Sequence, residues 1–313
     1  MPKTAKSAAD YILPLNINGL EGRMLRLPDT KKRGREILFV YGQHSSLERW
    51  WGIVQAFNDM GAVTMPDIPG FGGMTSLYKI GLDASIDNLA DYLAAFIKLR
   101  YRRKKVTIFG MSLGFVIVTR MLQKYPDLVG RVDDLISVVG FAHKDDFTFS
   151  KRRYWFYRLA AYVFSKKYTA LVYKVIFTRP FLLRMGYSRT FNAKEKFQNV
   201  SGDDFKQTMD MKIHLWKIND IRTQMRTGYE MLALDNTKKR INLPLIQVAS
   251  KKDRYFNHVR TEEHLRAVYN DFKLYYSKDP NHAPTIIADK KAASPFIPPE
   301  LKKELSSRRR RKK

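Results

Sequence analysis

The stretch KKVTIFGMSLGFVIVTRML, residues 104–122, decides the fold. Its apolar, β-branched run at 106–109 predicts a buried strand, and the apolar spacing after Ser112 predicts a helix. Between them, GMSLG (110–114) fits the G-x-S-x-G pattern of a nucleophile elbow. Such an elbow is a sharp strand-to-helix turn that exposes its central serine, so Ser112 becomes a candidate nucleophile.

The residues around Ser112 have the properties that such a turn needs. Gly110 and Gly114 lack Cβ atoms, so the strand and the helix can approach each other closely. The amide of Leu113 and the dipole of the following helix would point to the place where an oxyanion forms. The alternative is a structural turn that happens to contain a serine.

Strands and helices alternate on both sides of this stretch. Apolar or β-branched runs that predict strands lie at 35–42, 62–67, 135–141, 243–250 and 271–277. Helical patterns separate most of these runs. The alternation predicts an α/β fold with a mostly parallel central sheet and helices on both faces. The segments 11–19 and 22–28 predict a short antiparallel pair at one edge of that sheet.

The alternation stops between 144 and 239, where the sequence is helix-like and rich in aromatic and basic residues. We therefore predict one α/β core made of 1–143 and 240–313. A helical insertion at 144–239 separates its sixth and seventh strands. We expect the two ends, 1–10 and 304–313, to be disordered tails.

A nucleophilic serine needs a general base, and the base needs an acid that orients it. In a fold with this elbow the three groups follow the chain order serine, acid, histidine. Asp253 follows the seventh predicted strand and His282 follows the eighth. Loops at the carboxyl ends of neighbouring parallel strands converge in space. Ser112, Asp253 and His282 are therefore the predicted catalytic residues.

Other residues compete for the roles of base and acid. His143, after the sixth predicted strand, is the rival base. Asp145 and Asp146 are the alternative acids, because some enzymes of this architecture take the acid from that place. His44 lies beside the loop that follows the third predicted strand. The remaining histidines lie in helix-like segments and are expected at the surface or in packing: His214, His258 and His264.

Several short pieces of the sequence together resemble the α/β-hydrolase superfamily. They are FVYGQHSS (39–46), PDIPGFGG (66–73), GMSLG, and the pair ASKKD (249–253) and PNHAP (280–284). The resemblance covers the chain except the insertion and the two ends. It implies that the insertion is a helical cap over the active site. It also implies that the backbone amides of Gln43 and Leu113 form the oxyanion hole.

The chain departs from the family pattern at two positions. The oxyanion loop usually begins with His-Gly, whereas this sequence has Tyr41 before Gly42. Backbone donation should survive this change, but the hydrogen bonding of the loop must differ. Asn281 replaces the glycine that usually precedes the base, and asparagine tolerates left-handed conformations. Asp67, in the D-x-P-G-F-G segment, is expected to fix a turn.

The composition excludes several kinds of chemistry. The chain of 313 residues has no cysteine, which excludes disulfides, thiolate zinc sites and cysteine nucleophiles. No apolar segment resembles a signal peptide or approaches the roughly 20 residues of a membrane-spanning helix. We expect a cytoplasmic protein whose reaction needs no metal and no organic cofactor.

The net charge of +27 favours anionic partners. Residues 151–186 contain nine Lys or Arg, ten aromatic residues and no Asp or Glu. They could form an interfacial surface that meets an anionic membrane, together with the basic run at 308–313. We favour an ordinary cap, with aromatic side chains that line the pocket and pack the core while the basic ones are solvated. Nucleic acid is disfavoured because no recognition motif accompanies the charge.

The resemblance and the predicted residues together favour a serine hydrolase. The expected substrate is a small or medium hydrophobic carboxylic ester, cleaved through an acyl-enzyme intermediate. C–C bond hydrolysis, amide hydrolysis or acyl transfer on the same residues are alternatives. So is a non-catalytic protein that keeps this fold at a membrane surface. Haloalkane dehalogenases and epoxide hydrolases share the architecture but need Asp in place of Ser112, which argues against both.

Overall fold

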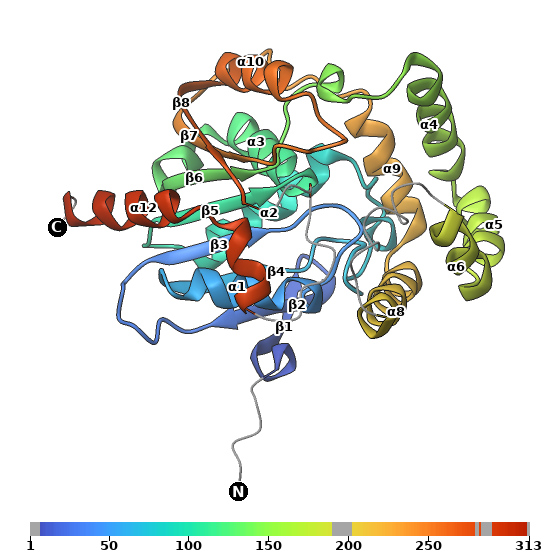
Figure 1. The fold of residues 1–313 in the computed structure, drawn as a ribbon, viewed down its shortest axis with the longest axis horizontal. Helices are drawn as coiled ribbons and strands as arrows, with labels where there is room; N and C mark the ends of the chain where they lie inside the picture. Colours follow the sequence, from blue (N-terminus) through green and yellow to red (C-terminus); the bar gives the residue numbers. More distant parts are fainter. Residues whose placement is uncertain (1–6, 190–201, 279–281, 283–289, 312–313) are drawn as a thin grey trace, which may run out of the picture.

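The structure is a computed structural model that describes residues 7–189, 202–278, 282 and 290–311. Its centre is an eight-stranded sheet with the strand order β1-β2-β4-β3-β5-β6-β7-β8 (Figure 1). Strands β3 to β8 are parallel, and β2 pairs antiparallel with both β1 and β4. The predicted α/β fold and the antiparallel edge pair are therefore confirmed. The strands are β1 (Ile12–Ile17), β2 (Leu20–Leu27), β3 (Glu36–Val40), β4 (Ala62–Pro66), β5 (Val106–Met111), β6 (Val132–Val138), β7 (Ile241–Ala249) and β8 (Tyr269–Tyr276).

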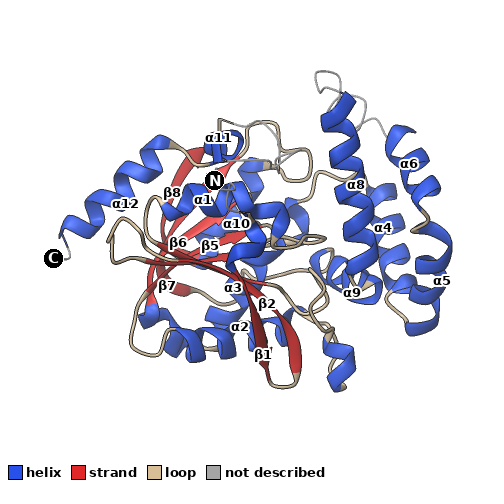
Figure 2. Ribbon diagram, turned by 90° about the horizontal axis from the view of Figure 1, so that it is seen from below, coloured by secondary structure: helices blue, strands red, loops and turns tan. Residues whose placement is uncertain are grey.

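Helices cover both faces of the sheet. α2 packs beside α3 on one face, whereas α1 packs against α11 on the other (Figure 2). No helix within the described ranges is long and apolar enough to cross a membrane. The helices outside the insertion are α1 (Trp51–Asn58), α2 (Ile86–Arg100), α3 (Leu113–Lys124), α10 (His258–Val268), α11 (Lys290–Ala293) and α12 (Pro299–Arg311).

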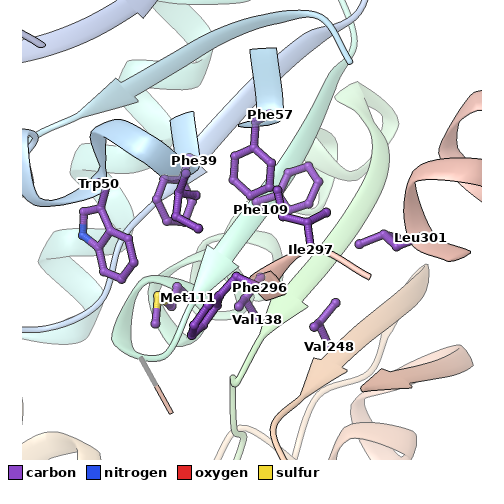
Figure 3. Close-up of a pocket in the computed structure, with 11 residues that line it drawn as sticks. Phe39, Trp50, Phe57, Phe109, Met111, Val138, Val248, Phe296, Ile297 and Leu301 are labelled. Carbon is purple, nitrogen blue, oxygen red and sulfur yellow. The ribbon is translucent and has the colours of Figure 1, made fainter. Parts of the chain in front are cut away.

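The central strands form the core of the protein. Every residue of β4 and β5 is buried, because helices pack on both faces of a parallel sheet. On the α1 side the packing leaves an apolar cavity with room for about one water molecule (Figure 3). Its lining has no titratable side chain, so the cavity belongs to the core. The lining residues are Phe39, Trp50, Ile53, Phe57, Phe109, Met111, Val138, Val248, Phe296, Ile297 and Leu301.

The helices between β6 and β7 gather at one end of the molecule (Figure 2). They are α4 (Lys151–Phe164), α5 (Lys167–Phe177), α6 (Pro180–Arg189), α8 (Gly202–Ile218) and α9 (Ile221–Met231). Several hydrogen bonds join them to the loop after β4. The amide of Asp220 donates to the carbonyl of Gly70 at 2.8 Å, and the amide of Gly72 donates to Asn219 Oδ1 at 2.8 Å. Because that loop follows a parallel strand, these helices stand over the carboxyl edge of the sheet. Their action as a lid stays a prediction.

The C-terminal segment corrects the prediction of a disordered tail from 304. α12 is helical to Arg311, and Leu301 and Leu305, one turn apart, are each 1% exposed. Arg35 Nη2 donates to the carbonyl of Leu305 at 2.6 Å and so joins this helix to the residue before β3. The prediction was wrong because it rested on the high charge at the end of the chain, whereas the two buried leucines anchor a helix there.

The N-terminal segment is also ordered further than predicted. Ala8–Tyr11 form a 3-10 turn that leads into β1. The amide of Ser7 donates to Asp10 Oδ2 at 2.7 Å, which closes a capping box around that turn. The rest of the predicted tails, residues 1–6 and 312–313, lies outside the described residues.

Candidate active site

Ser112 occupies a strained backbone position between β5 and α3. Its φ is +49° and its ψ is −119°, which is a conformation that residues other than glycine seldom adopt. A Cβ at Gly110 would lie 2.7 Å from the Cα of Phe115, and one at Gly114 would lie 2.2 Å from the carbonyl oxygen of Val40. Both distances are below van der Waals contact, so a larger residue at either glycine would force the elbow apart.

The side chains of Ser112, His282 and Asp253 form a hydrogen-bonded series. His282 Nε2 lies 3.3 Å from Ser112 Oγ, and His282 Nδ1 lies 2.7 Å from Asp253 Oδ2. The side chain of Asp253 is 2% exposed and that of His282 is 15% exposed. The structure thus brings together three predicted residues from the ends of β5, β7 and β8. Asn281, the residue before His282, lies outside the described residues.

Two backbone amides and two rings fix the orienting acid and the imidazole. Asp253 Oδ1 accepts hydrogen bonds from the amides of Tyr255 at 2.8 Å and Phe256 at 3.3 Å. The rings of these residues lie 5.1 and 5.3 Å from the His282 ring. An ionised carboxylate only accepts hydrogen bonds, so Nδ1 of His282 carries the proton in this pair. Nε2 is then free to accept the proton of Ser112.

The loop after β3 passes directly beside the elbow. A Cβ at Gly42 would lie 3.2 Å from the Cβ of Ser112. The next residue, Gln43, is anchored to α9, because its Nε2 donates to the carbonyl of Gln224 at 2.7 Å and to Thr227 Oγ1 at 3.0 Å. Leu113 is the first residue of α3, so its amide has no acceptor within the helix. Leu113 follows Ser112 directly, and Gln43 follows the glycine that lies against Ser112, so both predicted oxyanion donors belong to segments that adjoin the candidate nucleophile.

Tyr41, at the start of the loop after β3, is held by hydrogen bonds to the segment after β4. Its hydroxyl donates to Asp67 Oδ1 at 2.8 Å and accepts from the amide of Ile68 at 3.0 Å. Arg23 lies on the other side of the carboxylate, with Nε 3.2 Å from Asp67 Oδ2. Burial raises the pKa of Asp67 to about 7, although Arg23 opposes that shift. Asp67 thus fixes the turn after β4 and lies beneath the oxyanion loop.

The rival base and acids are occupied elsewhere. Asp146 is fully buried and accepts from the amides of Ala142 and His143 at 2.9 and 3.0 Å. Its other oxygen lies 2.5 Å from His264 Nδ1, which ties α10 to the loop after β6. The ring of His143 packs against that of His264, with their centres 4.6 Å apart. The amide of Asp145 donates to His143 Nδ1 at 3.2 Å. This cluster has a structural explanation that needs no catalytic role.

The sequence predicted the position of His44 beside the loop after β3 but assigned no role to it. It has a φ of +55°, and its ring lies 4.5 Å from that of Trp216 in α8. Nδ1 lies 2.9 Å from Gln224 Oε1, whereas the buried Nε2 has no hydrogen-bond partner among the described residues. Burial, reinforced by the positive charge of Arg49, lowers the pKa of His44 to about 3. His44 is therefore neutral where the oxyanion loop meets the inserted helices.

The other two histidines lie away from these interactions. His214 is exposed on α8, and His258 is the partly exposed first residue of α10. No group of three or more His, Asp or Glu side chains within the described ranges has the spacing of a metal site. The helix α9, which anchors Gln43 and His44, carries no recognisable motif, so sequence reasoning missed its contribution to the site.

Comparisons with known proteins agree with this architecture. The family model described as alpha/beta hydrolase fold matches residues 36–211. Among curated proteins, the sequence search found no match. An epoxide hydrolase from Bacillus megaterium is similar in structure, with a TM-score of 0.65, 14% identity, and coverage of 95% of this chain and 100% of that one.

Two further solved structures have the same fold. The esterase RhEst1 from Rhodococcus sp. ECU1013 has a TM-score of 0.63 at 14% identity and covers 95% of this chain and 99% of its own. The N-formylmaleamic acid deformylase of Pseudomonas putida S16 has a TM-score of 0.59 at 17% identity, with 90% and 98% covered. The family match spans more than half of the chain, and so this protein is a hydrolase that belongs to the α/β-hydrolase fold family.

Proposed function

We propose that the protein is a serine hydrolase of small or medium hydrophobic carboxylic esters. The single observation that carries the proposal is the series Ser112 Oγ, His282 Nε2 at 3.3 Å, and Asp253 Oδ2 at 2.7 Å from His282 Nδ1. A serine at a strained strand-to-helix turn with this pair behind it is the arrangement that acyl transfer requires.

In the first half of the reaction, Ser112 Oγ attacks the ester carbonyl carbon while its proton passes to His282 Nε2. Asp253 holds the Nδ1 proton and stabilises the imidazolium that forms. The amides of Gln43 and Leu113 bind the oxyanion of the tetrahedral intermediate, each donor lowering the barrier by roughly 3 kcal/mol. When the intermediate collapses, His282 gives its proton to the leaving alcohol and the acyl group stays on Ser112.

In the second half, His282 removes a proton from water, which attacks the acyl-enzyme. The same amides bind the second oxyanion, and the acid leaves as the proton returns to Ser112 Oγ. Every proton moves between Ser112, His282, water and the substrate, so the cycle balances with ester and water as its only reactants.

The side chains next to the base support a hydrophobic substrate. The rings of Tyr255 and Phe256 contact the imidazole of His282, and the ring of Trp216 contacts His44 beside the oxyanion loop. Such surfaces favour apolar acyl or alcohol groups through the hydrophobic effect. Amide hydrolysis, C–C bond hydrolysis and acyl transfer would use the same catalytic groups, so the test compares them with ester hydrolysis.

The test is steady-state hydrolysis of p-nitrophenyl esters of increasing acyl length by the wild type and by Ser112→Ala. We expect Ser112→Ala to lose about 10⁶-fold in kcat, as removal of a nucleophile does in serine hydrolases. Its thermal unfolding should match that of the wild type, which excludes misfolding as the cause. A wild type that cleaves matched amides or transfers acyl groups to alcohols faster than it hydrolyses any ester would reject the ester proposal.

A further inference from the structure

The helices α4, α5 and α6 carry large apolar side chains on their outer surface. This differs from the ordinary cap that we favoured from the sequence, in which the aromatic residues of 151–186 line a pocket and pack the core. Trp155 is 62% exposed, Leu171 60% and Phe181 74%. The exposed apolar residues of the three helices, here called the outer cap face, are Trp155, Phe156, Tyr157, Leu159, Tyr162, Val163, Tyr168, Leu171, Val172, Val175, Ile176, Phe177 and Phe181.

The inward sides of these helices hold small residues, the buried Leu183 of α6 and partly buried rings such as that of Tyr173, which lies 5.9 Å from the ring of Trp216. Ala161 is the buried residue of α4 and Ala170 is the buried residue of α5. On α5, Tyr168, Leu171 and Val175 follow the spacing of one helix face, and all three are at least half exposed. A helix of a soluble protein normally turns its largest apolar side chains inward. In α5 these three residues are exposed instead, so the apolar face that they form is available to something outside the chain.

Positive charge surrounds the outer cap face. Residues 151–186 hold nine Lys or Arg and no Asp or Glu. Lys166, Lys167 and Lys174 are exposed on or beside α5, between its apolar residues. Lys166 Nζ lies 4.4 Å from the centre of the Tyr162 ring, so the charges stand at the border of the apolar surface. Basic and apolar side chains interleaved in this way are typical of helices that lie in a membrane interface.

We propose that the outer cap face docks on an anionic lipid membrane, with α4 and α5 lying in the plane of the interface. Charge complementarity excludes the simplest protein partner, a second copy of this chain. In a two-fold dimer the face would meet its own copy, and the exposed Lys166, Lys167 and Lys174 would oppose the same three cations of that copy. The aromatic residues of the face can stack on nucleic-acid bases, but the aliphatic ones, such as Leu171 and Val172, gain nothing from a base, whereas a lipid interface accommodates both kinds. Lipid provides both an apolar phase and anionic headgroups.

The docking face connects to the candidate active site through α9. The hydroxyl of Tyr154 in α4 donates to the carbonyl of Leu232 at the end of α9, at 2.5 Å. Arg222 Nε in α9 donates to the carbonyl of Ser165, between α4 and α5, at 3.2 Å. α9 also anchors Gln43. Because α4, α5 and α6 lie at the end of the molecule beyond α9, a membrane at the outer cap face would lie on the side of the inserted helices remote from the sheet (Figure 1).

The experiment measures partitioning of the full chain onto vesicles of phosphatidylcholine, with and without phosphatidylserine, by co-sedimentation. We expect binding to the anionic vesicles that weakens as the ionic strength rises from about 0.01 to 0.15 M, because the Debye length falls from roughly 30 to 8 Å. Three variants carry the test. The basic variant is Lys166→Ser, Lys167→Ser and Lys174→Ser, and the apolar variant is Trp155→Ser, Leu171→Ser and Val175→Ser. The matched control is Arg102→Ser, Arg103→Ser and Lys105→Ser, which removes the same charge from an exposed loop outside the insertion.

Each cation at a membrane surface contributes roughly a fivefold factor in the partition coefficient, so the basic variant should bind about 100-fold more weakly. The apolar variant should lose at least about tenfold, since it no longer buries those side chains in the interface. The control variant and Ser112→Ala should bind like the wild type, which separates docking from the proposed chemistry. Equal losses in the basic and control variants would overturn the proposal. A dimer in solution that the apolar variant dissociates, without vesicle binding by the wild type, would overturn it as well.

Discussion

The sheet core buries its apolar side chains, whereas the outer cap face exposes them. In the core, β4 and β5 are buried along their whole length, and the helices that flank them turn apolar faces inward. On the outer cap face, side chains as large as Trp155 and Phe181 stay in contact with solvent. The core holds Ser112, Asp253 and His282, which lie at the ends of its parallel strands. The outer cap face holds none of them.

The buried apolar residues of the core stabilise the fold, whereas the exposed apolar residues of the outer cap face are free to contact a partner outside the chain. Burial of a leucine side chain stabilises the folded state by about 1.5–3 kcal/mol, which the outer cap face forgoes at most of its large residues. An exposed apolar surface of this kind persists in a folded protein when it serves an encounter with another phase or molecule. The comparison can be tested by changing matched residues in the two regions.

The largest expected effect concerns the acid of the triad. Asp253→Asn should lower kcat by about 10⁴-fold, because an amide in place of the carboxylate favours the wrong tautomer of His282. Trp155→Ser, on the outer cap face, should leave kcat on a water-soluble ester unchanged. Asp146→Asn is the matched control, since this carboxylate holds His264 and the loop after β6. A loss as large in Asp146→Asn as in Asp253→Asn, with the fold intact, would move the acid to the end of β6.

The next effect concerns stability. Leu38→Ala in β3 removes a side chain with no exposed surface and should lower the free energy of unfolding by 2–5 kcal/mol. Leu171→Ala in α5 makes the same chemical change at a residue that is 60% exposed, and should alter it by no more than about 0.5 kcal/mol. Urea unfolding of both variants measures the two values. If both variants lost a similar free energy of unfolding, the outer cap face would be packed in solution, and the two regions would not differ in burial.

A smaller effect tests the junction between the two regions at His44. Its pKa is about 3 in the folded protein and 6.5 when unperturbed, so below pH 6.5 the unfolded chain binds the extra proton. Stability from this residue is therefore present above pH 6.5 and is lost as the pH falls. The loss should reach about 2 kcal/mol between pH 7 and pH 5. His44→Gln, compared with the wild type by urea unfolding at both values, should lack this part of the pH dependence. An identical pH dependence in the variant would mean that His44 is not buried as a neutral group.

The sequence predicted the core well because its signals are local. Periodicity predicts the strand before Ser112, and turn chemistry explains the glycines on either side of it. The order of Asp253 and His282 along the chain follows the pattern known for folds with this elbow. The carboxyl ends of parallel strands lie at one edge of the sheet, so residues far apart in sequence meet there. The helix α12 was missed because the prediction for the last residues rested on their basic composition. The burial of Leu301 and Leu305 holds these residues in a helix instead.

The insertion was harder to predict, for a physical reason. The apolar spacing of Tyr168, Leu171 and Val175 fits a helix face that packs inward as well as one that faces outward. Only the tertiary contacts of α5 decide between the two, and those depend on Ala170 and on helices remote in the sequence. The anchoring of Gln43 by α9 and the burial of His44 against Trp216 also join distant segments without a local pattern.

The most direct test of the central claim is covalent labelling by a fluorophosphonate, followed by mass spectrometry of the peptides. The proposed chemistry predicts one phosphonate adduct, on the peptide that contains Ser112. The adduct should be absent in Ser112→Ala and should form far more slowly in His282→Ala, which keeps the nucleophile but lacks the base. An adduct that persists in Ser112→Ala, or that maps to a different serine in the wild type, would contradict the assignment of the nucleophile.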